Sequence, residues 1–112
     1  MDIDEFGRDP QVLAMRRVFA GMEAAQRELL AKLNVAPLDP RLRRWREKAF
    51  SLFQRAWAIG ARKGMRLNEE DLAAVYVHSM VRVIGQERGL PLEAGPLPGD
   101  ASIVRLVEEV AS

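Results

Sequence analysis

Apolar residues recur every three or four positions along most of the chain, which is the spacing that places side chains on one face of an α-helix. A first row comprises Val12, Met15, Phe19, Met22, Leu29 and Leu33, with the polar Gln26 in the same register. A second row in the same phase comprises Leu42, Trp45, Ala49, Leu52, Ala56 and Ile59. Both rows have the a/d spacing of antiparallel helices that pack side by side, so they predict an all-α fold.

Residues that favour the start of a helix precede both rows. Asp9 and Asp39 each supply a carboxylate that can cap a helix. Each is followed by a proline, whose missing N–H costs nothing at the first helical position. A third start is indicated at Asn68, because the three residues after it are acidic and suit the positive end of a helix dipole.

Glycine and proline mark where the helices end. Gly64 and Gly89 are natural stops, because glycine readily adopts the left-handed conformation that terminates many helices. The segment 89–101 is rich in Pro and Gly and is predicted to be a loop. The predicted helices therefore lie near 10–33, 40–62, 69–88 and 102–111.

The links and faces of these helices predict how they pack. The short link at 34–38 makes the first two helices fold back as a hairpin. The second helix is apolar over about half its circumference, so we expect it to be the central helix. The sequence thus predicts one domain over residues 1–112, an antiparallel three-helix bundle with residues 1–8 as a flexible tail. The short fourth helix would cover the remaining open face, either in its own chain or in a partner.

The composition limits both the cellular compartment that we expect for the protein and the chemistry that it can perform. The 112 residues contain no cysteine, which excludes disulfides, thiolate catalysis and cysteine-bound metals. The acidic N-terminus MDIDEFGRDP lacks the apolar run of a secretory signal. No apolar stretch approaches the roughly 20 residues that span a membrane. We therefore expect a cytoplasmic protein without membrane contact.

Catalytic motifs are missing from the sequence. It contains no nucleophile elbow, Walker loop, HExxH pair or EF-hand pattern. His78 is the sole histidine, and on the predicted helix Asp71 lies about two turns from it, too far to share a metal or a proton. We interpret His78 as a surface residue and expect a non-enzymatic protein without a cofactor or metal.

The formal net charge of +1 conceals three segments of different sign. Residues 1–40 carry net −2, residues 41–66 net +8 and residues 67–112 net −5. The basic segment opens with four arginines at the start of the second helix: Arg41, Arg43, Arg44 and Arg46. The helix dipole disfavours each cation there by roughly 0.3–1 kcal/mol. With the free backbone N–H groups beside them, these arginines form a candidate site for phosphate or a carboxylate-rich partner.

The arginines have two alternative uses within the chain. Their side chains could cap the last carbonyls of the first helix, which the hairpin brings beside them. The acidic residues Asp2, Asp4 and Glu5 could also fold over them. Nucleic acid is a possible ligand that is not favoured. The third helix has the recognition position in a helix-turn-helix outline, but its acidic start would repel phosphate.

These patterns support two hypotheses about function. The leading one is a small helical interaction module that binds another protein or, as a homodimer, a second copy of itself. The second and third helices are more apolar than a lone three-helix bundle requires, and the candidate interface residues are Phe50, Trp57 and Val81. The alternative is binding of an anion or a nucleic-acid backbone through Arg41, Arg43, Arg44 and Arg46.

Overall fold

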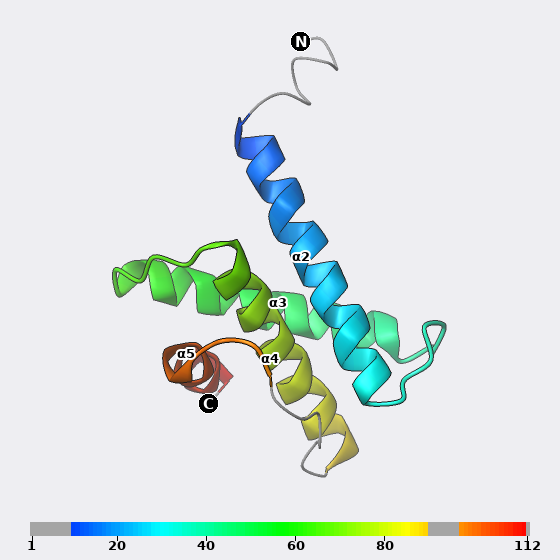
Figure 1. The fold of residues 1–112 in the computed structure, drawn as a ribbon. Helices are drawn as coiled ribbons and strands as arrows, with labels where there is room; N and C mark the ends of the chain where they lie inside the picture. Colours follow the sequence, from blue (N-terminus) through cyan, green and yellow to red (C-terminus); the bar gives the residue numbers. More distant parts are fainter. Residues whose placement is uncertain (1–9, 90–96, 112) are drawn as a thin grey trace.

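The structure, a computed structural model, describes residues 10–89 and 97–111. These residues form an all-α bundle (Figure 1). Its helices are α2 (Pro10–Lys32), α3 (Leu42–Arg62), α4 (Glu69–Arg88) and α5 (Ala101–Ala111). The four helices predicted from the sequence are confirmed, with boundaries that differ by at most two residues. The predicted tail at 1–8 and most of the predicted loop at 89–101 lie outside the described residues.

Local hydrogen bonds explain both ends of α4. The side chain of Asn68 accepts a hydrogen bond from the backbone N–H of Asp71 (2.8 Å), and the Asp71 carboxylate accepts one from the N–H of Asn68 (3.1 Å). This reciprocal capping box satisfies N–H groups that a helix start leaves without partners. Gly89 ends α4 in the left-handed conformation, with φ of +66°. The predicted start at Asn68 and stop at Gly89 are confirmed.

The start of α3 corrects one prediction. Helix α3 begins at Leu42 rather than at Pro40, and Arg41 occupies the cap position without a side-chain capping bond. Asp39 still acts just before the helix, because its carboxylate accepts the backbone N–H of Arg41 at 2.9 Å. The carboxylate therefore stabilises a turn that leads into α3. The other predicted cap, Asp9, lies outside the described residues.

Helix α4 is the centre of the bundle, so the expectation of a central second helix is wrong. The backbone of α4 packs against α2, α3 and α5. Among the described residues, no Cα atom of α2 comes within 8 Å of one in α3. The physical reason is that α4 is apolar nearly all round. Nine of its residues are buried, including Val75, Tyr76 and Met80.

Side chains rather than backbones connect α2 with α3. The rings of Phe19 and Phe50 lie with their centroids 6.3 Å apart. Further along, the Gln26 amide bridges Tyr76 and Arg46, since one amide orientation gives both of its atoms a complementary neighbour. In that orientation its nitrogen donates to the Tyr76 hydroxyl (2.6 Å) and its oxygen accepts from the Arg46 guanidinium (2.8 Å). From the first contact to the second, residue numbers rise along α2, from Phe19 to Gln26, and fall along α3, from Phe50 to Arg46. The two helices therefore run in opposite directions, as predicted for a hairpin.

The N-terminal half of α2 extends past the other helices (Figure 1). The sequence placed Met15 and Phe19 in a packed row, but their exposed fractions are 39% and 45%. Val18 is buried between them, and Leu30 is buried near the other end of the helix. Because α2 diverges from α3, the predicted row is covered only where α4 lies alongside it.

Helix α5 closes the face of α3 and α4 that α2 leaves open. Its apolar side is buried and comprises Ile103, Leu106, Val107 and Val110. A Cβ at Gly60 would lie 3.2 Å from Leu106, so glycine at this position lets α3 and α5 approach closely. The fourth helix therefore packs within its own chain. None of the described helices is both long and apolar enough to cross a membrane.

Candidate functional site

The four arginines at the start of α3, which we call the arginine cluster (Arg41, Arg43, Arg44 and Arg46), each have a partner within the chain. Arg41 donates two hydrogen bonds to the carboxylate of Asp39, at 3.1 and 2.8 Å. Its guanidinium also lies 4.8 Å from the ring centroid of Trp45, where cation–π attraction holds it. This candidate anion-binding side chain is therefore held against its own helix start.

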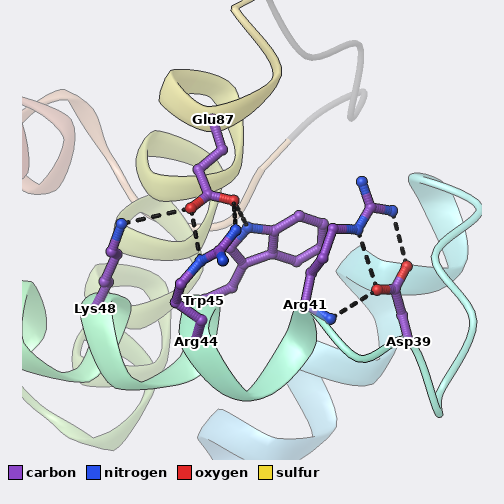
Figure 2. Close-up of polar contacts among 6 residues, drawn as sticks. All are labelled: Asp39, Arg41, Arg44, Trp45, Lys48 and Glu87. Carbon is purple, nitrogen blue, oxygen red and sulfur yellow. Dashed lines mark hydrogen bonds and ion pairs between the residues drawn. The ribbon is translucent and has the colours of Figure 1, made fainter.

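Glu87, in the last turn of α4, receives several donors from α3 (Figure 2). Arg44 donates two hydrogen bonds to its carboxylate, at 2.9 and 2.7 Å. The indole N–H of Trp45 donates a third at 2.5 Å, and the Lys48 ammonium approaches to 3.4 Å. A carboxylate that accepts two parallel bonds from a guanidinium is well oriented. Glu87 therefore joins the start of α3 to the end of α4.

The contacts with the arginine cluster lower the pKa of the two carboxyl groups that accept them, those of Asp39 and Glu87. The hydrogen bonds from Arg44 and then from Trp45 lower the pKa of Glu87 to about 2. The hydrogen bonds from Arg41 likewise lower the pKa of Asp39 to about 2. Conversely, the bond to Glu87 raises the pKa of Arg44. All of these groups are charged near neutral pH, so they form intrachain ion pairs rather than a group suited to proton transfer.

The remaining two arginines are paired more loosely. Arg43 lies 3.4 Å from Glu47 one turn along α3, with both side chains largely exposed, a geometry worth little to stability. Arg46 contacts Gln26. The last carbonyls of α2, which capping by the arginines was one way to satisfy, accept backbone N–H groups of the following turn, such as that of Val35. The proposed cover from Asp2, Asp4 and Glu5 lies outside the described residues.

An open apolar groove of about 470 Å³ runs between the N-terminal half of α2 and the C-terminal half of α3. We call it the α2–α3 groove, and it is lined by Met15, Val18, Phe19, Phe50, Phe53, Gln54, Trp57, Ala58 and Ala61. It continues into a shallower hollow of about 820 Å³ that reaches the start of α4 at Glu69 and Glu70. Met15, Val18 and Trp57 line both parts, so the two form one continuous depression.

Aromatic rings build the floor of the α2–α3 groove. Phe53 is buried and lies at the centre, with its ring centroid 5.8 Å from that of Phe50 and 5.6 Å from that of Trp57. Tyr76 from α4 meets Phe53 edge-on at 6.1 Å. Tilted and edge-on pairs at these distances are favourable arrangements. The floor is therefore a packed aromatic cluster, and the exposed Phe19 stands on its rim.

The candidate interface residues from the sequence separate in space. Phe50 and Trp57 are half-buried and lie together in the α2–α3 groove, whereas Val81 on α4 does not line it. Sequence reasoning missed Met15 and Phe19, because it placed them in the core. A usable signal was present, since apolar residues on α2 cover more of its circumference than one neighbouring helix can bury.

The polar stripe of α4 faces α5 and the segment before it. His78 is partly exposed at the surface, and its Nε2 lies 2.8 Å from the backbone carbonyl of Pro98. Arg82 pairs with Glu108 on α5 at 2.7 Å. These residues therefore attach the C-terminal part of the chain to α4. In the part of the chain that the structure describes, no three potential metal ligands gather.

Comparison of the chain with protein-family models, with curated proteins and with solved structures finds no match.

Proposed function

We propose that this protein is a non-enzymatic helical interaction module that associates with a second copy of itself through the α2–α3 groove. The cytoplasm is its expected place of action. The observation that carries this proposal is the exposure of Phe19 and Met15 directly above an aromatic floor. Contiguous apolar surface of this kind is typical of sites where a partner binds.

Burying the exposed part of Phe19 in an interface would contribute a sizeable binding free energy. With 45% of the residue exposed, about 90 Å² of a side chain of ~200 Å² remains in water. Burying it at ~25 cal/mol per Å² contributes about 2 kcal/mol for each copy. Phe19 is therefore the natural anchor of an interface, because a few buried aromatic residues usually supply most of the binding energy.

A second copy is the occupant that the shape and the charge support. One surface carries both exposed apolar side chains of α2, Met15 and Phe19, and a hollow that the small residues Ala58 and Ala61 help to line. A surface with both features can complement itself about a two-fold axis, the commonest symmetry of soluble oligomers. The net charge of +1 adds little repulsion between two copies.

The arginine cluster supports the alternative, anion binding, less well. Arg41 and Arg44 hold well-oriented carboxylates of their own chain, so an external anion would have to displace them. The α2–α3 groove has no comparable occupant among the described residues. The proposed function therefore rests on the α2–α3 groove rather than on the arginine cluster.

The test compares two substitutions to glutamate. Phe19→Glu puts a charge on the groove rim, whereas Leu38→Glu, in the α2–α3 link where Leu38 is 94% exposed, is the matched control. Sedimentation velocity at roughly 100 µM detects association with a Kd up to about that value. We expect a dimer of the 12.6 kDa chain for the wild type and Leu38→Glu, and a monomer for Phe19→Glu. A monomeric wild type, or equal effects of both variants, would refute the proposal.

A further inference from the structure

The C-terminal part of α2 and the link that follows it form a pocket of about 230 Å³ against the start of α3. Asn34 reverses the chain with φ of +56°, and the backbone N–H of Val35 donates to the carbonyl of Leu30 at 2.9 Å. This pattern is a Schellman motif, in which an apolar residue after the helix packs on one in its last turn. The lining residues of the pocket are Gln26, Arg27, Leu30, Ala31, Val35, Pro37, Leu42 and Arg46. Leu30 and Val35 therefore stand together in its wall.

Much of the wall of this pocket is apolar. Leu30, Val35 and Leu42 are buried, and Pro37 of the link lines the pocket with them. The volume is below the roughly 300–1,000 Å³ of pockets that hold drug-sized ligands. A ligand that fits is therefore small and has an apolar part of only a few carbon atoms.

Two arginines line the pocket, Arg27 from α2 and Arg46 from α3, and among the described residues no acidic residue does. The other members of the arginine cluster pair with carboxylates of their own chain, whereas Arg46 contacts the neutral amide of Gln26. Glu23 lines a separate hollow with Arg46 and is not part of this pocket. The amide of Gln26 orients Arg46 without neutralising its charge, so the pocket offers two cations to an anion from outside.

We propose that this pocket binds a small aliphatic carboxylate. The carboxylate pairs with Arg27 and Arg46, and the alkyl chain packs on the apolar wall. A planar guanidinium matches the two oxygens of a carboxylate and can donate to both. Beside an apolar wall such a pair is stronger than in bulk water. A phosphate ion has no apolar part and would leave the wall exposed to water.

This pocket is separate from the α2–α3 groove. The lining residues of the two do not overlap in the part of the chain that the structure describes. The inference therefore does not depend on self-association, and either proposal can fail while the other stands. Phe19→Glu, which tests the groove, should leave binding of the carboxylate unchanged.

The experiment is a titration of the full-length chain with isocaproate, a branched aliphatic carboxylate, read by the chemical shifts of the backbone amides. A ligand this small reaches a Kd on the order of 1 mM. We expect saturable shifts at the amides of lining residues such as Val35 and Leu42. Two probes each lack one half of the ligand: isohexanol has the same carbon skeleton without the charge, and inorganic phosphate has charge without the alkyl chain. Each should bind about tenfold more weakly or less.

Three arginine-to-glutamine variants make the same charge change at different places. Arg27→Gln and Arg46→Gln each remove one cation from the pocket and should raise the Kd of isocaproate about tenfold. Arg43→Gln removes a cation from the same arginine cluster outside the pocket and should leave the Kd within about twofold. Arg27 and Arg43 are both exposed on helix surfaces, so their comparison remains valid even if Arg46→Gln disturbs the contact with Gln26.

Four outcomes would overturn the site. Isocaproate that gives no saturable shifts up to roughly 50 mM does not bind in the pocket. Equally tight binding of isohexanol would mean that the arginines have no role. Equally tight binding of phosphate would mean that the apolar wall has none. Equal losses in Arg27→Gln and Arg43→Gln would indicate a general effect of charge rather than pairing inside the pocket.

Discussion

The buried bridge formed by Gln26 between Tyr76 and Arg46 allows a quantitative test of how α2 is held on α4. Gln26 and Tyr76 are each only 5% exposed, and their side chains lie 2.6 Å apart. Burial also raises the pKa of Tyr76, so its hydroxyl stays neutral under ordinary conditions. Tyr76→Phe keeps the ring and deletes the oxygen, which leaves the Gln26 amide nitrogen buried without an acceptor.

An unsatisfied buried amide costs about 1–3 kcal/mol. That is a large share of the roughly 5–15 kcal/mol by which domains of this kind are stable. With a denaturant slope of about 2 kcal/mol per M, the urea midpoint of Tyr76→Phe should fall by about 1 M. Far-ultraviolet circular dichroism measures this transition, since the described chain is largely helical.

A double-mutant cycle identifies the cause of the loss. Gln26→Met replaces the amide with an apolar side chain of similar length, and Arg46 is exposed enough to be solvated instead. The double variant Gln26→Met/Tyr76→Phe removes both buried polar partners, so its loss should be at least 1 kcal/mol smaller than the sum of the single losses. Strictly additive losses, or a change below about 0.5 kcal/mol in Tyr76→Phe, would show that the bridge does not hold α2 in place.

Two further predictions concern acid stability and helix packing. The pKa of Glu87 is lowered in the folded state from 4.5 to about 2, so its ion pairs stabilise the fold above pH 4.5 and are lost as the pH falls toward 2. The unfolding free energy of the wild type, measured from pH 7 to pH 2, should therefore decline as the pH falls below 4.5. The decline should be less steep in Glu87→Gln, which has no carboxylate to protonate at this position. If the two curves of unfolding free energy against pH are parallel, the ion pairs of Glu87 do not contribute to acid stability. Gly21→Ala should stabilise α2 by about 0.5–1 kcal/mol, because glycine is a poor helix former and the new Cβ would lie 3.9 Å from Ala73. Gly60→Ala should give no such gain, because its Cβ would crowd Leu106 at 3.2 Å, and thermal unfolding of the pair compares the two directly. Equal shifts in melting temperature would contradict the proposed close approach at Gly60.

Local features of the fold could be predicted from the sequence, because local interactions determine them. Asn68 and Gly89 bound α4 through hydrogen bonds and backbone conformations that involve only neighbouring residues. The central place of α4 could not be predicted in the same way. Periodicity reports which side of a helix is apolar, but the number of neighbours depends on how helices cross. The exposure of Phe19 was missed for a different reason, because the breadth of the apolar side of α2 was not compared with what one neighbouring helix can bury.

The candidate site, too, could be predicted only in part. The arginine cluster was visible because Arg44 stands at the positive end of a helix dipole, where cations are disfavoured. Its partner, Glu87, stands 43 residues later in the last turn of α4, where acids are disfavoured for the corresponding reason. A pair of charges at unfavourable helix ends is a signal that sequence analysis can use. It indicates that two helix ends of opposite polarity meet in the fold.

The central position of α4 has a consequence for the order of folding during synthesis. The first two helices share no close backbone contact, so a nascent chain that ends at Gly64 carries α2 and α3 without the helix that both pack against. Their apolar faces remain uncovered until α4 has emerged from the ribosome. Helices α2 and α3 both need α4 to cover their apolar faces, so the core cannot close before α4 is available. The N-terminal helix, although synthesised first, can therefore pack its backbone against the bundle only after α4 has emerged.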